Sequence, residues 1–260
     1  MAAGGWHTLA LKTDGTLWAW GSNSCGRLGD GSEMSSTVPV KIGCDFVQIA
    51  AGEFHSVGVK SDGTLWGWGR NSLGCLGKTK ERNCLVPVLM GQGFVQVAVG
   101  SEHTVAIRND GTLWSWGNNH YGQLGVGKMG RDVERDNGQE FVNGLESSED
   151  PILVGNDFVQ VSASLGTTMA IKSDGALWGW GYNSAGQLGN GSTKWPALPD
   201  CLGFDYVEVA SGSFHSAAIK CDGTLWTWGS NNEGQLGDGT RVNRMLPVQI
   251  GINSTESSSD

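Results

Sequence analysis

Short runs in which apolar and polar residues alternate lie on both sides of an Asp-Gly pair, and this arrangement recurs along the chain. Before Asp62-Gly63, the side chains of residues 55–60 alternate with a period of two. After the pair, Trp66 and Trp68 fall on the same face. A period of two is the spacing of side chains on one face of a β-strand. Asp-Gly between two such runs favours a tight type I′ turn. The pattern therefore predicts a β-hairpin.

The hairpin pattern occurs five times at a nearly constant spacing. Successive pairs lie 48, 48, 64 and 48 residues apart, at Asp14-Gly15, Asp62-Gly63, Asp110-Gly111, Asp174-Gly175 and Asp222-Gly223. A fixed period of this size indicates a repeat architecture, in which each unit buries its faces against its neighbours. The residue between the paired tryptophans is always modest in size. We therefore expect the indoles of one unit to lie on the small residues of the next.

Two further strands complete each unit. One is a Phe-Val-Gln-Ile-Ala run at residues 46–50, with copies at 94–98, 158–162 and 206–210. The other contains proline, as in Val38-Pro39-Val40, and proline is tolerated in an edge strand. Four strands in each unit of 40–50 residues predict an all-β fold, a β-propeller of about five four-stranded blades. The predicted units form one domain over residues 2–251, divided as 2–45, 46–93, 94–157, 158–205 and 206–251.

The repeat has a recognisable consensus. Residues 51–56 read Ala-Gly-Glu-Phe-His-Ser, and they are followed by Lys-x-Asp-Gly-Thr-Leu-Trp-x-Trp-Gly and Asn-x-x-Gly-x-Leu-Gly. This consensus resembles the repeat of the regulator of chromosome condensation family. Its Lys-x-Asp-Gly-Thr-Leu-Trp segment is most similar to that of bacterial members. The resemblance covers Ala2 to about Gly251. It implies that the five blades belong to a seven-bladed ring.

The first unit is not preceded by a Phe-Val-Gln-type strand, so the five units contain four such strands. Three arrangements remain open: part of a longer seven-bladed ring, an open or five-bladed ring with one incomplete blade, or two copies that pair their edges. Residues 252–260 are polar, and we expect them to form a disordered tail.

Composition narrows the possible partners. The formal net charge is −9, and the basic stripe expected of a nucleic-acid-binding protein is not visible in the sequence. The sequence shows neither a signal peptide nor an apolar run of transmembrane length. The six cysteines lack metal-binding spacing and are expected to be free thiols. These features predict a cytoplasmic protein that binds neither nucleic acid nor membranes.

The repeated polar residues are interpreted as structural. A histidine begins the hairpin in four units, at His7, His55, His103 and His215, and Thr167 replaces it in the fourth. A catalytic residue is normally present once, so we expect these histidines to bond neighbouring turn backbone. The repeated aspartates are assigned to the turns. No catalytic, cofactor-binding or metal-binding residue is predicted.

The 64-residue interval contains an insertion within residues 128–150. It is highly charged and mostly acidic, and propeller insertions usually map to loops on one face. It is either a solvated excursion or a surface that contacts a partner. Trp195 lies outside the repeated tryptophan pairs and is a further interface candidate. The predicted partner-binding residues are Arg131, Asp132, Glu134, Arg135, Asp136, Glu140, Phe141 and Trp195.

Two functions follow from these observations. The first is a non-enzymatic module that binds another protein through its loops and the acidic insertion. The second, implied by the family resemblance, is a guanine-nucleotide exchange factor for a small GTPase, which needs no catalytic nucleophile. An enzyme that uses the central channel would require convergent, non-repeated polar groups, which we do not find in the sequence. We therefore favour the interaction module.

Overall fold

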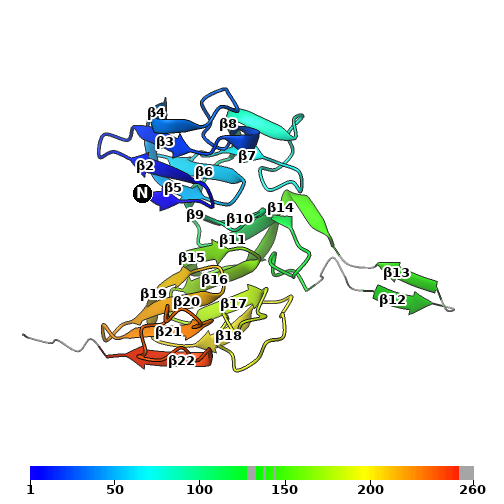
Figure 1. The fold of residues 1–260 in the computed structure, drawn as a ribbon. Coiled ribbons are helices and arrows are strands. Elements are labelled where there is room, and N and C mark those ends of the chain that lie inside the picture. The colour runs from blue at the N-terminus through cyan, green and yellow to red at the C-terminus, as the bar shows by residue number, and fades with distance from the viewer. Residues whose placement is uncertain (128–132, 137–138, 143–144, 252–260) are drawn as a thin grey trace, which may run out of the picture.

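The computed structural model describes residues 1–127, 133–136, 139–142 and 145–251. These residues form five four-stranded antiparallel sheets and one two-stranded hairpin. This confirms the prediction of an all-β fold with five four-stranded blades. The polar tail predicted over residues 252–260 lies outside the described residues. Figure 1 shows the sheets following one another from the first two at the top to the last two at the bottom.

The blades share one strand order. The first consists of β1 (Ala2–Ala3), β2 (His7–Leu11), β3 (Leu17–Gly21) and β4 (Ser36–Gly43). The second consists of β5 (Phe46–Ala51), β6 (His55–Lys60), β7 (Leu65–Arg70) and β8 (Asn83–Gly91). The third consists of β9 (Phe94–Val99), β10 (His103–Arg108), β11 (Leu113–Asn118) and β14 (Ser147–Gly155). The fourth consists of β15 (Phe158–Ser164), β16 (Thr167–Lys172), β17 (Leu177–Gly181) and β18 (Asp200–Gly203). The fifth consists of β19 (Tyr206–Ser211), β20 (His215–Lys220), β21 (Leu225–Gly229) and β22 (Arg244–Ile250).

The first strand of each blade is the inner strand, because β1, β5, β9, β15 and β19 contact one another in sequence. Glutamines on these strands connect neighbouring blades. Gln48 Oε1 accepts a 2.9 Å hydrogen bond from the backbone N–H of Val97. The proline-containing strands, such as β4 and β22, are the outer ones, as expected for a residue without a backbone donor.

The first blade has a fourth strand that the sequence pattern did not reveal. β1 comprises only Ala2 and Ala3, which pair with Leu9 and Thr8 of β2. Its two residues correspond to the end of a Phe-Val-Gln-type strand. The expectation that the first unit lacks this strand was therefore wrong, because two residues are enough to form the ladder.

The Asp-Gly turns also differ from the prediction. In the second blade, Gly63 has a φ of +79° and donates a 2.9 Å hydrogen bond to the carbonyl of Lys60. Asp62 does not have a positive φ, so a type I′ turn is wrong. The geometry fits a type I turn followed by a left-handed glycine. Asp62 Oδ1 accepts from the backbone N–H of Thr64 at 3.0 Å, which confirms that the repeated aspartate stabilises the turn.

In the second to fifth blades, the second tryptophan of the pair packs against the preceding blade. Trp68, Trp116, Trp180 and Trp228 are fully buried. Trp68 lies in one cluster with Leu9, Ala19 and Leu28 of the first blade, and its Nε1 donates to the carbonyl of Arg27 at 3.0 Å. A Cβ atom at Gly29 would lie 2.7 Å from Cδ1 of Trp68, so the indole rests on the last glycine of the Asn-x-x-Gly-x-Leu-Gly segment of the preceding blade. The expected contact with the residue between the paired tryptophans was wrong, because that residue in the second blade, Gly67, faces Leu76 and Met90 of its own blade.

In the first three blades, the repeated histidine connects its blade to the next through a hydroxyl group. The Nε2 atom of His7 lies 2.7 Å from Ser56 Oγ, and that of His103 lies 3.0 Å from Thr168 Oγ1. Burial lowers the pKa of both imidazoles to about 4. These contacts confirm a structural role. The hydroxyl partner belongs to the next blade, and a backbone hydrogen bond to that blade also acts on the pKa of two imidazoles, with Ser101 for His55 and with Leu165 for His103.

Each of the six cysteines is a free thiol, as expected. Within the described ranges, no helix has the length and apolar character needed to cross a membrane.

Candidate functional site

One position of the repeat changes character from blade to blade. The residue before the first hairpin strand is Trp6, Phe54, Glu102, Gly166 and Phe214 in successive blades. The third and fourth blades therefore lack the aromatic side chain that the others place there. A pocket of about 330 Å³ lies at this point, and we call it the aromatic pocket. Its lining comprises Ser101, Glu102, Asn118, His120, Tyr121, Gln123, Leu165, Gly166, Tyr182 and Phe214.

Gly166 leaves the space that two tyrosines occupy. A Cβ atom at residue 166 would lie 2.8 Å from Cδ2 of Tyr121 and 3.3 Å from Cβ of Tyr182. Both separations are below ordinary van der Waals contact, so even alanine would displace the Tyr121 ring. The absence of a side chain at residue 166 is therefore a condition for the present ring arrangement.

The rings beside the pocket form one cluster. The ring centroids of Tyr121 and Tyr182 lie 4.9 Å apart, and each lies 5.1 Å from Trp195. Phe214 extends the cluster, with 6.3 Å between its ring and that of Tyr182. The rings of His120 and Tyr121 meet edge to face at 5.0 Å. Such pairs stabilise their geometry beyond simple area burial, so the rings support one another.

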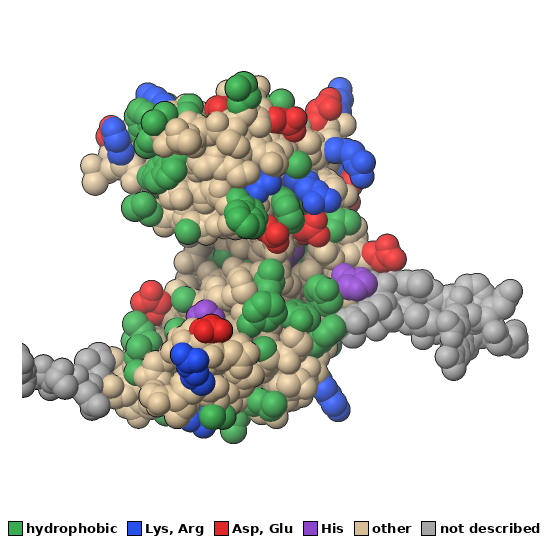
Figure 2. Space-filling model, in the orientation of Figure 1, with side chains coloured by type: hydrophobic (Ala, Val, Ile, Leu, Met, Phe, Trp, Pro, Cys, Tyr) green, Lys and Arg blue, Asp and Glu red, His purple; other side chains and the backbone are tan. Residues whose placement is uncertain are grey.

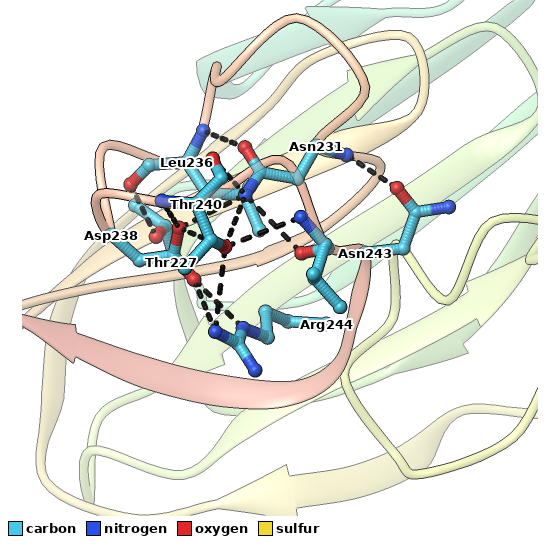
Figure 3. A network of polar contacts seen from close by, with 8 residues as sticks. Thr227, Asn231, Leu236, Asp238, Thr240, Asn243 and Arg244 are labelled. Atoms are coloured by element: carbon cyan, nitrogen blue, oxygen red, sulfur yellow. Dashed lines mark hydrogen bonds and ion pairs between the residues drawn. The ribbon is translucent and has the colours of Figure 1, made fainter.

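Buried asparagines position the loops that carry these rings. Asn183 Oδ1 accepts from the backbone N–H of Leu188, and its Nδ2 donates to the carbonyl of Lys194 at 3.0 Å. Lys194 directly precedes Trp195. Figure 3 shows the fifth-blade copy of this network, in which Asn231 contacts Leu236 and Asp238. The repeated Asn-x-x-Gly-x-Leu-Gly motif therefore determines where the loop aromatics lie.

In the fourth blade, Thr167 replaces the repeated histidine and positions Tyr182. Thr167 Oγ1 donates a 2.7 Å hydrogen bond to the carbonyl of Tyr182. The backbone N–H of Tyr182 donates to the carbonyl of Gly166 at 2.8 Å. The substitution noticed in the sequence thus lies beside the aromatic pocket and fixes the backbone of one of its walls.

Glu102 brings negative charge to the pocket. Its Oε2 accepts from Asn118 Nδ2 at 3.2 Å, and its Oε1 lies 3.7 Å from Arg70 Nη1. The guanidinium of Arg70 lies 5.1 Å from the Phe54 ring, and that of Arg27 lies 5.4 Å from the same ring. Arginine, aromatic and carboxylate groups therefore alternate along this part of the surface.

The aromatic pocket and the insertion share one face, formed by the loops before β2, β6, β10, β16 and β20 and the loops after β3, β7, β11, β17 and β21. We call it the loop face. The backbone N–H of Asn119 donates to the carbonyl of Glu146 at 2.8 Å, and its Nδ2 donates to that of Leu145. The returning end of the insertion is thus bonded next to His120 and Tyr121. In Figure 2, hydrophobic side chains gather around a hollow in the molecule.

The predicted partner-binding residues fall into three groups. Arg131 and Asp132 lie outside the described residues. The hairpin β12 (Val133–Asp136) and β13 (Gln139–Val142) stands away from the blades in Figure 1 and carries the rest of the insertion group, which is Glu134, Arg135, Asp136, Glu140 and Phe141. In its register, Glu134 pairs with Phe141 and Arg135 with Glu140. Trp195 is the one member that the described contacts bring into the aromatic cluster.

Sequence reasoning missed Glu102, Gly166, Tyr182 and Phe214. For Glu102, Gly166 and Phe214 the signal was available, because aligning the five units shows that the residue before the repeated His/Thr position is aromatic in three blades and is glutamate or glycine in the other two. A change at a repeated surface position marks a place where the blades are not equivalent. The shape of the pocket required the three-dimensional neighbours of that position.

A second hollow of about 400 Å³ lies where the inner strands end, and it shares Ser101 and Leu165 with the aromatic pocket. Its lining is mainly alanine, glycine and serine, with Glu53 as an acidic member. In the part of the chain that the structure describes, no three His, Cys, Asp or Glu side chains come together as a metal site. The aromatic pocket is therefore the stronger candidate for recognition.

Comparisons with known proteins agree with this architecture. A family model described as RCC1-like domain matches residues 1–259. The human WBSCR16 structure superposes with a TM-score of 0.79 at 24% identity, over 96% of this chain and 65% of that one. Yeast RCC1 (Prp20), solved with Kap60 bound, has a TM-score of 0.68 at 23% identity, over 98% and 75%. Prp20p from Saccharomyces cerevisiae has a TM-score of 0.63 at 23% identity, over 98% and 77%. This chain therefore spans about two thirds to three quarters of the length of these structures.

Proposed function

Because the chain belongs to the RCC1-like domain family, we propose that it is a non-enzymatic module that binds another protein through its loop face. The observation that carries this proposal is the aromatic cluster of Tyr121, Tyr182, Trp195 and Phe214 beside a pocket on the face that also bears the insertion. Partly exposed aromatic residues next to a pocket are typical of interface hot spots. Phe214 is 43% exposed, and an aromatic surface of this kind is available to a partner.

The relatives supply the class of partner to be tested. Yeast RCC1 (Prp20) has been crystallised with Kap60, and Prp20p has been examined for binding to Gsp1p and histones. All of these partners are proteins. A second candidate function, exchange of guanine nucleotide on a small GTPase, is favoured by the same likeness to Prp20p. It remains compatible with a chain in which no catalytic residue is predicted.

To test binding, the wild-type chain and two variants are used as bait to capture a protein partner. The captured partner is then purified, and its affinity for each form of the chain is measured by calorimetric titration. The double variant Tyr182→Ala, Trp195→Ala is expected to weaken binding by at least about tenfold. Phe204→Ala is the matched control, because Phe204 is 58% exposed and lies next to Asp205, whose carbonyl accepts from Cys221 on the side of the Asp-Gly turns. Equal binding by the double variant and wild type would exclude the loop face.

Exchange activity needs its own assay. The release of a fluorescent guanine nucleotide from a panel of small GTPases, Gsp1p included, is measured with and without the chain. Faster release that is lost in the double variant would support the second function. Unchanged release across the panel, combined with partner binding at the loop face, would leave the interaction module as the function.

We also propose that the five blades belong to a seven-bladed ring. The chain matches 65% to 77% of the length of the structures compared above, a share consistent with five blades of seven. A thermal melt of residues 1–260 with light scattering tests this arrangement. A compact monomer with a cooperative melt would favour a self-contained five-bladed form instead.

A further inference from the structure

The aromatic pocket combines three features that together indicate the chemistry of its ligand. It has aromatic walls in Tyr121, Tyr182 and Phe214, a carboxylate in Glu102, and a base at Gly166 that carries no side chain. We propose that this pocket binds the cationic side chain of a lysine or arginine presented by the protein partner. The inference rests on the proposed function, because it names what the partner inserts at the loop face.

The aromatic walls favour a cation. A cation over the face of a tyrosine or phenylalanine is attracted by the electrons of the ring, and the attraction strengthens where water is excluded. Tyr121 and Tyr182 meet at 4.9 Å with Trp195 packed against both, so their positions are established before a ligand arrives. A volume of about 330 Å³ is at the lower end of the range for ligand pockets, and it suits one long side chain.

Glu102 distinguishes a cationic ligand from an apolar one. A carboxylate has about four acceptor sites. Among the described residues, Glu102 accepts one hydrogen bond, from Asn118, and its second oxygen is 3.7 Å from Arg70. That separation is longer than a hydrogen bond. The carboxylate therefore retains acceptor capacity on the pocket side, which an ammonium or guanidinium group would use and a leucine would leave unpaired.

The neighbouring blade shows the same chemistry within the chain. Two guanidinium groups, those of Arg27 and Arg70, lie over the Phe54 ring at 5.4 Å and 5.1 Å, and Arg70 also approaches Glu102. In the fourth blade, Gly166 replaces Phe54 and Tyr182 replaces Arg70 in the repeat. The aromatic surface there is thus present without the arginine of its own blade, and the partner would supply the cation.

Charge complementarity supports the same partner. The chain has a net charge of −9, and residues 130–150, whose returning end is bonded beside Tyr121, include seven acidic and two basic residues. A negative field raises the encounter rate with a basic surface. A partner that presents lysine or arginine would be attracted to the loop face before its side chain enters the pocket.

The test uses the tyrosines as reporters, since the chain contains three. Incorporation of 3-fluorotyrosine gives ¹⁹F signals for Tyr121 and Tyr182 at the pocket and for Tyr206, which is buried in β19 and serves as an internal control. Single Tyr→Phe variants assign the signals. The probes are the Nα-acetyl amides of lysine, arginine and norleucine, the last being an uncharged side chain of similar length.

The lysine and arginine probes are expected to shift the Tyr121 and Tyr182 signals in a saturable manner and to leave Tyr206 unchanged. The norleucine probe should bind at least about fivefold more weakly, and Glu102→Gln should weaken the cationic probes by about fivefold to tenfold. Equal shifts with norleucine, or unchanged affinity in Glu102→Gln with the Tyr206 signal preserved, would overturn the inference.

The outcomes separate this inference from the proposed function. If the captured protein partner shifts Tyr121 and Tyr182 but the cationic probes do not, the loop face binds the partner and the cation pocket is wrong. If neither the partner nor the probes shift these signals, the loop face itself is wrong. If acetylation of the partner's lysines, which removes their positive charge and leaves the arginines unmodified, abolishes the tyrosine shifts, lysine is the side chain that enters the pocket.

Discussion

Gln96 Oε1 accepts a 2.9 Å hydrogen bond from the backbone N–H of Val161, and this bond joins the inner strands of the third and fourth blades. The same relationship connects Gln48 to Val97 and Gln160 to Val209. The glutamine of the Phe-Val-Gln-type strand thus connects two neighbouring blades by a hydrogen bond.

We expect Gln96→Leu to destabilise the fold by about 1–2 kcal/mol, because the N–H of the buried Val161 loses its acceptor. Urea denaturation measures the change. Glu208→Leu is the matched control, since Glu208 occupies the corresponding position of the fifth blade and is exposed. Equal unfolding midpoints for Gln96→Leu and wild type would show that the bond does not stabilise the blade interface.

The contribution of an indole hydrogen bond to the free energy of unfolding can be measured by comparing two tryptophans at equivalent positions of the repeat. Trp180 Nε1 donates to the carbonyl of Gln123 at 2.9 Å, whereas Trp116 Nε1 is buried without a partner among the described residues. Trp180→Phe and Trp116→Phe remove similar volume. We therefore expect Trp180→Phe to cost about 1 kcal/mol more in unfolding free energy. Equal losses would mean that packing alone determines the contribution of these residues.

The buried histidines predict a loss of stability in mild acid. Burial lowers the pKa of His7 and His103 to about 4 and that of His55 to about 3. Between an unfolded pKa of about 6.5 and these folded values, the unfolded chain binds protons that the folded chain does not. The free energy of unfolding should therefore fall as the pH decreases from 6.5 to about 4, by up to about 1.4 kcal/mol per pH unit for each histidine.

Guanidinium denaturation at several pH values tests this dependence. A variant with His55→Gln and His103→Gln should show a shallower decline than wild type over the same interval. His120→Gln is the control, because the His120 side chain is exposed, whereas those of His55 and His103 are buried. A decline with the same slope in the double variant would assign the acid sensitivity to other groups.

Much of the fold could be predicted from local patterns. The Asp-Gly pairs and alternating runs predicted the hairpins because turn chemistry and strand periodicity act within a few residues. The predicted turn type was wrong, because Asp62 adopts a negative φ and its side chain accepts a hydrogen bond from Thr64. The alternation of apolar and polar residues does not distinguish between these turn types. β1 was missed because two residues, Ala2 and Ala3, are too short to show a period.

The candidate site was less predictable because it depends on contacts between blades. Trp195 could be selected as a residue outside the repeated pairs. Its neighbour Tyr182 could not, since the 5.1 Å contact joins residues brought together by the loop that Asn183 organises. The aligned repeats show that Gly166 replaces an aromatic residue, but the rings of Tyr121 and Tyr182 that occupy the vacated space are identified only in three dimensions.

Gly166→Ala is the most direct test of this arrangement. The added Cβ would lie 2.8 Å from the Tyr121 ring, so the ring must move out of its contact with Tyr182. We expect the ¹⁹F signal of Tyr121 to shift, partner affinity to fall by about fivefold or more, and stability to decrease by about 1–3 kcal/mol. Gly251→Ala introduces the same methyl group where no atom lies within 4 Å, and it should change none of these quantities. An unmoved Tyr121 signal in Gly166→Ala would show that the glycine does not determine the shape of the pocket.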